Sequence, residues 1–279
     1  MIHKTNKETI YAVGDIHGEF NSIGHWIKTN DLKDCVIIFC GDFGLGFEAL
    51  VTEQTLLKKV NGVCEERDIE LFAIRGNHDD PSYYQGEDKF NLSRFKAVSD
   101  YDLIVSPQHT ILCLGGAISI DRQARIQAYD VNVMNYAFRH NMNYTRASEE
   151  VRPYYWKDEP FHFDLNKINN LPEEYKIDVV CSHSAPDIAY PITKVGLDGW
   201  LKMDEALRED LDRERRDLTN VFDYLKEHEH PVNKWIYGHF HTKMNEVILG
   251  TNFILLDMGR DSKKRNTGNS GCHFDYTII

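Results

Sequence analysis

The sequence predicts an α/β fold built on a parallel sheet, and two observations carry that prediction. In the first third of the chain, short apolar runs alternate with longer segments of helical periodicity. Nearly every early apolar run also ends in a polar cluster that contains Asp or His. The first pattern is typical of strand–helix–strand units with right-handed crossovers. The second places polar side chains beyond the carboxyl ends of the strands, where open α/β sheets bind ligands.

The apolar runs have the length and composition of buried strands. They cover residues 10–13, 36–40, 71–74, 110–114, 179–181, 235–237 and 253–256. Helices are expected at 19–30 and 48–67. In the second of these, the apolar residues recur at helical spacing: Leu50, Leu56, Leu57, Val60 and Val63. The chain therefore opens as βαβαβ.

Two later regions have a different character. Residues from about 121 to 175 are rich in Tyr, Arg, Asn and Trp and show no clean periodicity. Residues from about 199 to 229 form a highly charged helix pattern, which we interpret as a solvated helix face. We expect one domain over residues 1–279, with these regions as helical or irregular insertions near the site. A loop is expected at 260–271, before a last strand at 273–279.

Composition narrows the class of protein. The 279 residues carry 32 basic and 44 acidic side chains, so the net charge is 32 − 44 = −12. Such a chain is a poor non-specific binder of nucleic acid or anionic membrane, but bound cations would still allow a phosphate substrate. No apolar run approaches the ~20 residues of a membrane span, and no signal-peptide pattern opens the chain. We expect a cytoplasmic protein. The sequence carries no signal for its oligomeric state.

Five polar clusters follow predicted strands: GDIHG at 14–18, GDFG at 41–44, RGNHD at 75–79, SH at 182–183 and GHFH at 238–241. Asp15 and His17 are two residues apart, so on extended backbone both can reach one metal. His239 and His241 repeat that spacing. Each motif alone could be a turn or a surface pair. Together they predict a metal site, because five of the 13 histidines fall at strand ends.

The residue types indicate the metals. Asp42 stands at a tight turn, and a carboxylate there can bridge two cations ~3.5–4 Å apart. Asn77 offers an amide oxygen, and imidazole with carboxylate suits Mn, Fe, Ni or Zn. We expect two divalent ions, with Mn first among these. A structural zinc site is the weaker alternative, because no Cys cluster is present.

In this order, GDIHG, GDFG, RGNHD, SH and GHFH resemble the calcineurin-like metallophosphoesterases. The resemblance implies a four-layer α-β-β-α sandwich of two mixed sheets flanked by helices, with a dinuclear centre at one edge. Matched by position, the first metal would be held by Asp15, His17 and His241, the second by Asn77, His183 and His239, and both by Asp42. His78 matches a catalytic histidine beside the metals, and Arg75 a phosphate-contacting position of the protein-phosphatase branch.

The chain departs from that branch in its second block. The branch has Gly-Asp-x-x-Asp-Arg-Gly, whereas residues 41–47 read GDFGLGF. The second Asp, which pairs with the catalytic histidine there, is absent, so Asp79 becomes the candidate partner of His78. Residues 114–125 are similar to a segment of bacterial and phage members of the family.

The expected reaction is hydrolysis of a phosphate ester, with metal-bound hydroxide attacking phosphorus in line. His78 would protonate the leaving oxygen, and Arg75, Arg122 and Arg125 would clamp the phosphate. For Arg122 and Arg125 a surface salt bridge is an equal alternative. The expected substrate is a nucleotide or small phosphoester. The alternatives are a phosphoprotein Ser/Thr phosphatase, a nuclease or cyclic-nucleotide phosphodiesterase and, last, a non-catalytic binding module.

Overall fold

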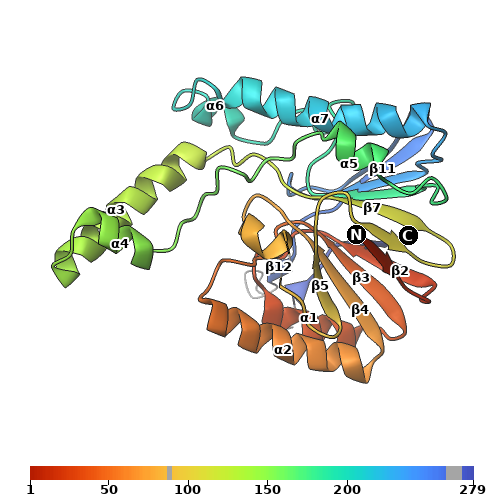
Figure 1. The fold of residues 1–279 in the computed structure, drawn as a ribbon, viewed down its shortest axis with the longest axis horizontal. Coiled ribbons are helices and arrows are strands. Elements are labelled where there is room, and N and C mark those ends of the chain that lie inside the picture. Colours follow the sequence, from red (N-terminus) through yellow and green to blue (C-terminus); the bar gives the residue numbers. More distant parts are fainter. Residues whose placement is uncertain (87–89, 262–271) are drawn as a thin grey trace.

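The protein has four layers in the order helix, sheet, sheet, helix (Figure 1). The computed structural model describes residues 1–86, 90–261 and 272–279. Both sheets are mixed, so the predicted α-β-β-α sandwich is confirmed. Residues 262–271, which make up most of the predicted C-terminal loop, lie outside the described part.

The first sheet contains the predicted βαβαβ opening. Its order is β14-β2-β3-β4-β5, and only β14 runs antiparallel to its neighbour. Its strands are β2 (Thr9–Val13), β3 (Cys35–Cys40), β4 (Ile69–Ile74), β5 (Phe95–Val98) and β14 (Tyr276–Ile278). The parallel register brings the carboxyl ends of β2, β3 and β4 to the same sheet edge.

The second sheet has the order β1-β6-β7-β8-β9-β11-β10. Its strands are β1 (Ile2–Lys4), β6 (Leu103–Val105), β7 (Thr110–Leu114), β8 (Val179–Ser182), β9 (Lys234–Tyr237), β10 (Met244–Ile248) and β11 (Thr251–Leu255). The central strands β7, β8, β9 and β11 are parallel. A short antiparallel pair, β12 (Arg260–Asp261) with β13 (Cys272–His273), lies apart from both sheets.

Helices cover the outer face of each sheet (Figure 1). Beside the first sheet lie α1 (Phe20–Thr29) and α2 (Leu50–Glu66), with the short 3-10 helix η1 (Pro81–Tyr84) after β4. Over the second sheet lie α5 (Leu165–Asn169), α6 (Leu197–Trp200) and α7 (Leu207–Glu227). The remaining pair, α3 (Arg122–His140) and α4 (Tyr144–Glu150), projects from the body as an arm.

The central strands of both sheets are buried on both faces, which explains their continuous apolar sequence. In β3, Cys35, Ile37 and Phe39 pack toward α1 and α2. The alternate residues of that strand, from Val36 to Cys40, belong to a separate core cluster between the two sheets. Successive side chains of a strand point to opposite faces, so one short run fills two layers.

The arm contains a long helix that the sequence pattern did not locate. Residues 121–175 show no clean periodicity, yet α3 is a helix of 19 residues. The reason is that Val133 is its buried residue, so no apolar stripe marks the helix. By contrast, the charged helix α7 does bury a face, with Leu218, Val221 and Leu225 against the second sheet. Across the described ranges, no helix has the length and apolar character needed to cross a bilayer.

Candidate metal centre

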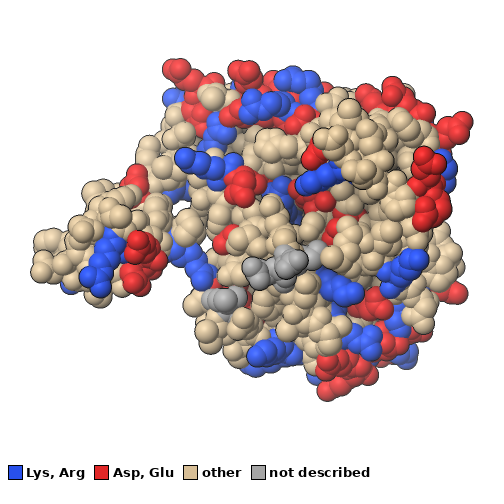
Figure 2. Space-filling view, in the orientation of Figure 1, with Lys and Arg blue, Asp and Glu red and all other residues tan. Residues whose placement is uncertain are grey.

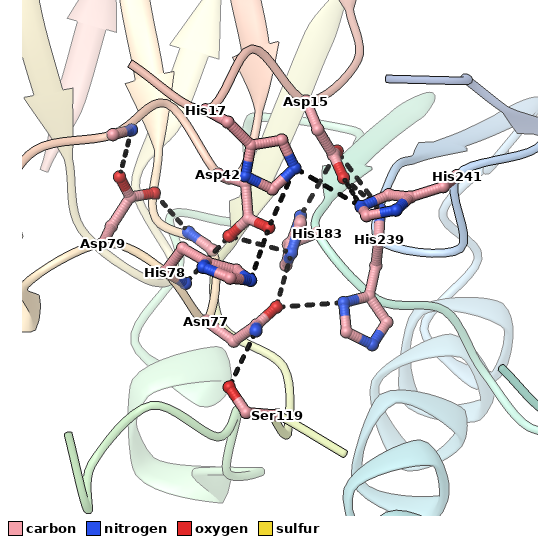
Figure 3. Close-up of polar contacts among 12 residues, drawn as sticks. Asp15, His17, Asp42, Asn77, His78, Asp79, Ser119, His183, His239 and His241 are labelled. Atoms are coloured by element: carbon pink, nitrogen blue, oxygen red, sulfur yellow. Dashed lines mark hydrogen bonds and ion pairs between the residues drawn. The ribbon is translucent and has the colours of Figure 1, made fainter. Parts of the chain in front are cut away.

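The structure brings together all seven residues that the sequence suggested as metal ligands (Figure 3). They come from the loops that follow β2, β3 and β4 of the first sheet and β8 and β9 of the second. The two sheets therefore contribute to one cluster at their shared edge. Two groups can be distinguished on either side of Asp42. The outer group is Asp15, His17 and His241, and the inner group is Asn77, His183 and His239.

The outer group surrounds one face of Asp42. Asp15, His17, Asp42 and His241 each offer a ligand atom, and these atoms lie within 4.8 Å of one another. The Nε2 atoms of His17 and His241 are 3.3 Å apart, and His241 Nε2 is 3.4 Å from Asp15 Oδ2. Both carboxylates are buried, whereas the side chains of His17 and His241 are 19% and 33% exposed. This side of the cluster is open to solvent.

The inner group lies on the other face and is closed. Asn77 Oδ1 is 3.1 Å from His183 Nε2 and 3.0 Å from His239 Nδ1. His183 Nε2 is also 3.3 Å from Asp42 Oδ1. The opposite ring nitrogen, His183 Nδ1, donates to the carbonyl of Cys40 at 3.0 Å, so Nε2 is the ring nitrogen that faces the cluster. Asp42 therefore faces both groups.

The backbone around these residues is unusual. Several of the candidate ligands adopt the left-handed region, which costs free energy for a residue with a Cβ and is common at functional sites. They are His17 (φ 46°), Asp42 (φ 43°), His239 (φ 70°) and His241 (φ 52°).

Glycines allow the close packing of the two carboxylates. A Cβ on Gly76 would lie 2.0 Å from Asp42 Oδ1, and one on Gly238 would lie 2.1 Å from Asp15 Oδ1. Glycine is therefore required at both positions for the carboxylates to stand where they do.

These residues fit divalent cations. Asp42 Oδ2 is buried and, within the described part of the chain, accepts no hydrogen bond. Such an atom is costly unless a cation satisfies it. Burial alone would raise the pKa of Asp42, but the neighbouring His183, His78 and His17 hold it well below its usual range. The carboxylate form needed for metal binding is thus favoured.

The buried carboxylates in turn affect the pKa of His183. Burial alone would lower the pKa of its imidazole, yet Asp42 and Asp15 raise it to about 9. Without a metal, a proton on this ring balances the buried carboxylates. A cation would replace that proton, as metal binding to histidine requires.

His78 lies beside the cluster, next to Arg125. Its Nε2 is 3.9 Å from Asp42 Oδ2, and the two terminal nitrogens of the Arg125 guanidinium lie 3.2 and 2.8 Å from the two ring nitrogens of His78. Burial lowers the pKa of His78 to about 4; Asp42 opposes this shift and Arg125 adds to it. The ring is therefore neutral at pH 7. Arg125 lies at the site and also pairs with Asp121 through Nε.

The structure does not bring Asp79 to His78. Both oxygens of the Asp79 carboxylate accept backbone N–H groups, with Oδ1 bound to Gly44 and Leu45 and Oδ2 to Phe43 and Gly76. In Figure 3 the Asp79 carboxylate lies to one side of the cluster. Asp79 thus holds the loop after β3 against the loop after β4, and the pairing expected from the sequence is not formed in the described structure.

Two of the three predicted phosphate-binding arginines are engaged elsewhere. The buried guanidinium of Arg75 donates to the carbonyls of residues 158, 159 and 160 and pairs with Asp100. Arg122 binds Asp204 and Asp210, and those carboxylates raise its pKa. Arg75 ties the segment after the arm to the loop before Asn77, and Arg122 ties α3 to the start of α7. These partners hold the two terminal nitrogens of Arg75 and the Nε and Nη2 of Arg122.

Three residues near the cluster were not predicted. Ser119, in the loop after β7, accepts a hydrogen bond from Asn77 and donates one to Glu159. Burial raises the pKa of Glu159 to about 8. Ser119 falls after a predicted strand, which is a weak signal, but nothing in the sequence around Glu159 marks it.

The third unpredicted residue is Lys194. It is half-buried between exposed Thr193 and Val195, and it interacts electrostatically with Asp42 and Asp15. Burial lowers the pKa of its ammonium, and those carboxylates oppose the shift. Arg215 of α7 fixes the loop that leads to Lys194 through five backbone carbonyls between residues 185 and 192.

Comparison with known proteins gives one family match. The model of the calcineurin-like phosphoesterases matches residues 8–243, a range that includes every candidate ligand. No curated protein matches the chain.

Solved structures with a similar arrangement include a dimetal phosphatase from Danio rerio, with 13% identity over 91% of this chain and 88% of that chain and a TM-score of 0.46. They also include the phosphopantetheinyl hydrolase of Mycobacterium tuberculosis, with 15% identity, 95% coverage of both chains and a TM-score of 0.37. A predicted phosphoesterase from Streptococcus pneumoniae gives 11% identity over 99% of this chain and 84% of that chain, with a TM-score of 0.30. At these values the solved structures carry no inference about function.

Proposed function

The chain belongs to the calcineurin-like phosphoesterase family and is a metal-dependent phosphoester hydrolase, and from this premise we propose that a dinuclear centre at the sheet edge hydrolyses a nucleotide or another small phosphoester. The observation that carries the proposal is the position of Asp42. Its Oδ1 lies beside the inner group, and its buried Oδ2 accepts no hydrogen bond from the described residues and faces the outer group.

The proposed ligands divide as the two groups do. Asp15, His17 and His241 would hold one cation, Asn77, His183 and His239 the other, and Asp42 both. Bound cations supply a low-pKa water and neutralise charge on the phosphate. Among the candidate metals, Mn is proposed first, because three carboxylate or amide oxygens accompany the four imidazoles, and Fe, Ni and Zn are the alternatives.

The phosphate would enter from the open side of the cluster. We propose that Arg125 and Lys194 contact its oxygens, since both carry positive charge beside the cluster. Arg125 pairs with Asp121 only through Nε, so its two terminal nitrogens lie against His78. The guanidinium offers a fork of donors that matches phosphate, and the ammonium a point charge. Arg125 now rests on His78, so a bound phosphate would share or replace that contact.

His78 is proposed to donate a proton to the leaving oxygen. Its ring is neutral without substrate, because burial opposes the charged form. A phosphate between His78 and Arg125 would bring negative charge next to the ring and raise its pKa, which favours the protonated donor. Asp42, which also accepts the backbone N–H of His78, fixes the position of that residue.

The alternative substrates receive less support. The missing second Asp and the engaged guanidinium of Arg75 remove two features of the phosphoprotein phosphatases. In Figure 2, acidic and basic side chains are interspersed over the visible face, without the continuous basic patch that would favour a nuclease.

The test is metal-dependent hydrolysis of an aryl phosphate by two variants. Asp42→Asn should reduce turnover to background, because an amide cannot bridge two cations as a carboxylate does. His78→Ala should reduce kcat by ~10²-fold or more while the metal content stays near that of the wild type. Activity retained by Asp42→Asn would exclude the bridging role, and metal loss in His78→Ala would make His78 a ligand.

A further inference from the structure

The inner group depends on the orientation of one amide. Asn77 can bind a cation only through its oxygen, since the other end of the side chain carries two N–H donors. In the structure, Asn77 Oδ1 faces His183 and His239, and Nδ2 donates to Ser119 Oγ at 2.8 Å (Figure 3). The hydrogen bond to Ser119 therefore determines that the oxygen of Asn77, and not its nitrogen, faces the two histidines.

Ser119 is itself held in one orientation. Its hydroxyl accepts from Asn77, so its own proton must go to another acceptor. That acceptor is Glu159: Ser119 Oγ donates to Glu159 Oε2 at 2.8 Å, and Ser119 N donates to Oε1 at 2.6 Å. Asn77 and Glu159 are each 1% exposed and Ser119 is 2% exposed, so water does not compete with these hydrogen bonds.

We propose that Glu159 is a positioning residue for the inner metal: through Ser119 it keeps the oxygen of Asn77 pointed at the cation. The inference rests on the proposed function, because it assigns Asn77 as a ligand. Glu159 lies in the segment after the arm, and its buried carboxylate touches neither metal nor substrate. Outer-lying partners of this kind affect metal affinity by orienting the ligand they support.

A carboxylate is the group that this arrangement requires. Glu159 accepts both donors of Ser119, the backbone N–H and the hydroxyl. A glutamine has one acceptor atom, so it can accept only one of them and must turn an N–H toward the other. If the glutamine nitrogen faces the Ser119 hydroxyl, it donates to that hydroxyl, and Ser119 must then donate its own proton to Asn77. An Asn77 amide that accepts this proton turns its oxygen toward Ser119 and its nitrogen toward the cation. Cations beyond Asn77 favour the ionised form of Glu159.

The segment that carries Glu159 is fixed in place by a second contact. The carbonyls of residues 158, 159 and 160 accept hydrogen bonds from Arg75, which lies two residues before Asn77. The same segment therefore meets the Asn77 loop through its backbone and through the Glu159 side chain. This double contact sets the distance between Glu159 and Ser119 and leaves little freedom for the carboxylate.

The test is a titration of the metal-free protein with Mn²⁺, with stoichiometry and the two dissociation constants measured by calorimetry and the coupled pair followed by electron paramagnetic resonance. Glu159→Gln should weaken the inner site by about 10- to 100-fold and leave the outer site within about twofold of the wild type. Ser119→Ala should weaken the same site. Asp158→Asn is the matched control, because it removes a neighbouring exposed carboxylate and should change neither constant.

The double variant separates positioning from general damage. If Glu159 acts through Ser119, then Glu159→Gln in the Ser119→Ala background should change the inner constant by less than about twofold. Additive losses, or wild-type affinity in Glu159→Gln, would overturn the inference. Should Glu159→Gln fail to fold, Ser119→Ala alone must weaken the inner site, and wild-type affinity there would also overturn it. A wild-type protein that binds fewer than two ions would refute the proposed function instead.

Discussion

The outer and inner groups of the centre differ in their exposure and in what stands behind them. His17 and His241 are partly exposed, and their Nε2 atoms lie 3.3 Å from each other. His183 is fully buried and bound to the carbonyl of Cys40, and Asn77 is supported by Ser119 and Glu159. His183 and Asn77 are held in place before any metal arrives, whereas the two outer histidines lie at the solvent-exposed side of the cluster. The outer side is also where substrate can approach.

The largest expected effect contrasts one ligand from each group. In the metal-free protein, His183→Ala should lower the free energy of unfolding by ~3–5 kcal/mol, because it leaves the buried Asp42 carboxylate without its closest positive partner. His241→Ala removes a partly exposed ring and should cost less than ~1 kcal/mol. Urea unfolding measures both values, and metal analysis should show that His241→Ala retains one ion. Equal destabilisation would remove the distinction between the groups.

A smaller effect is expected at the open side. Arg125→Ala should lower kcat/KM by about 10- to 100-fold, the worth of a charged hydrogen bond to the phosphate. Lys194→Met should lower it by about 10-fold or less, since a half-buried ammonium is more screened. Steady-state kinetics with an aryl phosphate provides the measurement, with metal stoichiometry as the control. Loss of a metal in either variant would show that the residue supports the centre and not the substrate.

A third effect concerns the support behind the inner group. Burial raises the pKa of Glu159 from 4.5 to about 8, so the folded metal-free protein retains a proton that the unfolded chain has released in this range. Its contribution to stability is present below about pH 4.5 and is lost as the pH rises through about 8. The melting temperature of the wild type relative to Glu159→Gln should therefore fall between pH 5 and pH 8.5. A constant difference would contradict this assignment.

The strand-end positions of the ligands could be predicted from the sequence because chain order alone determines them. A parallel strand that ends in Asp42 or His183 must deliver that residue to the sheet edge, whatever the rest of the fold does. The α-helices next to these strands were equally readable from their apolar spacing. The arm was not, because α3 packs almost no apolar face.

Side-chain direction was beyond the reach of sequence motifs. Arg75 and Asp79 flank Asn77 and His78, but the first turns to carbonyls of residues 158–160 and the second to backbone N–H groups of the Asp42 loop. Both sets of hydrogen bonds depend on segments that reach the site only through tertiary packing. The same is true of Lys194 and Glu159, which lie outside the five motifs.

The hydrogen bond from His183 to the carbonyl of Cys40 affects how the centre can change during evolution. A peptide oxygen is present whatever residue occupies position 40, so no single substitution deletes that acceptor. The amide of Asn77, in contrast, relies on two replaceable side chains. Random drift should therefore erode the support of Asn77 before that of His183, and a lineage losing its enzymatic role would first become a one-metal protein.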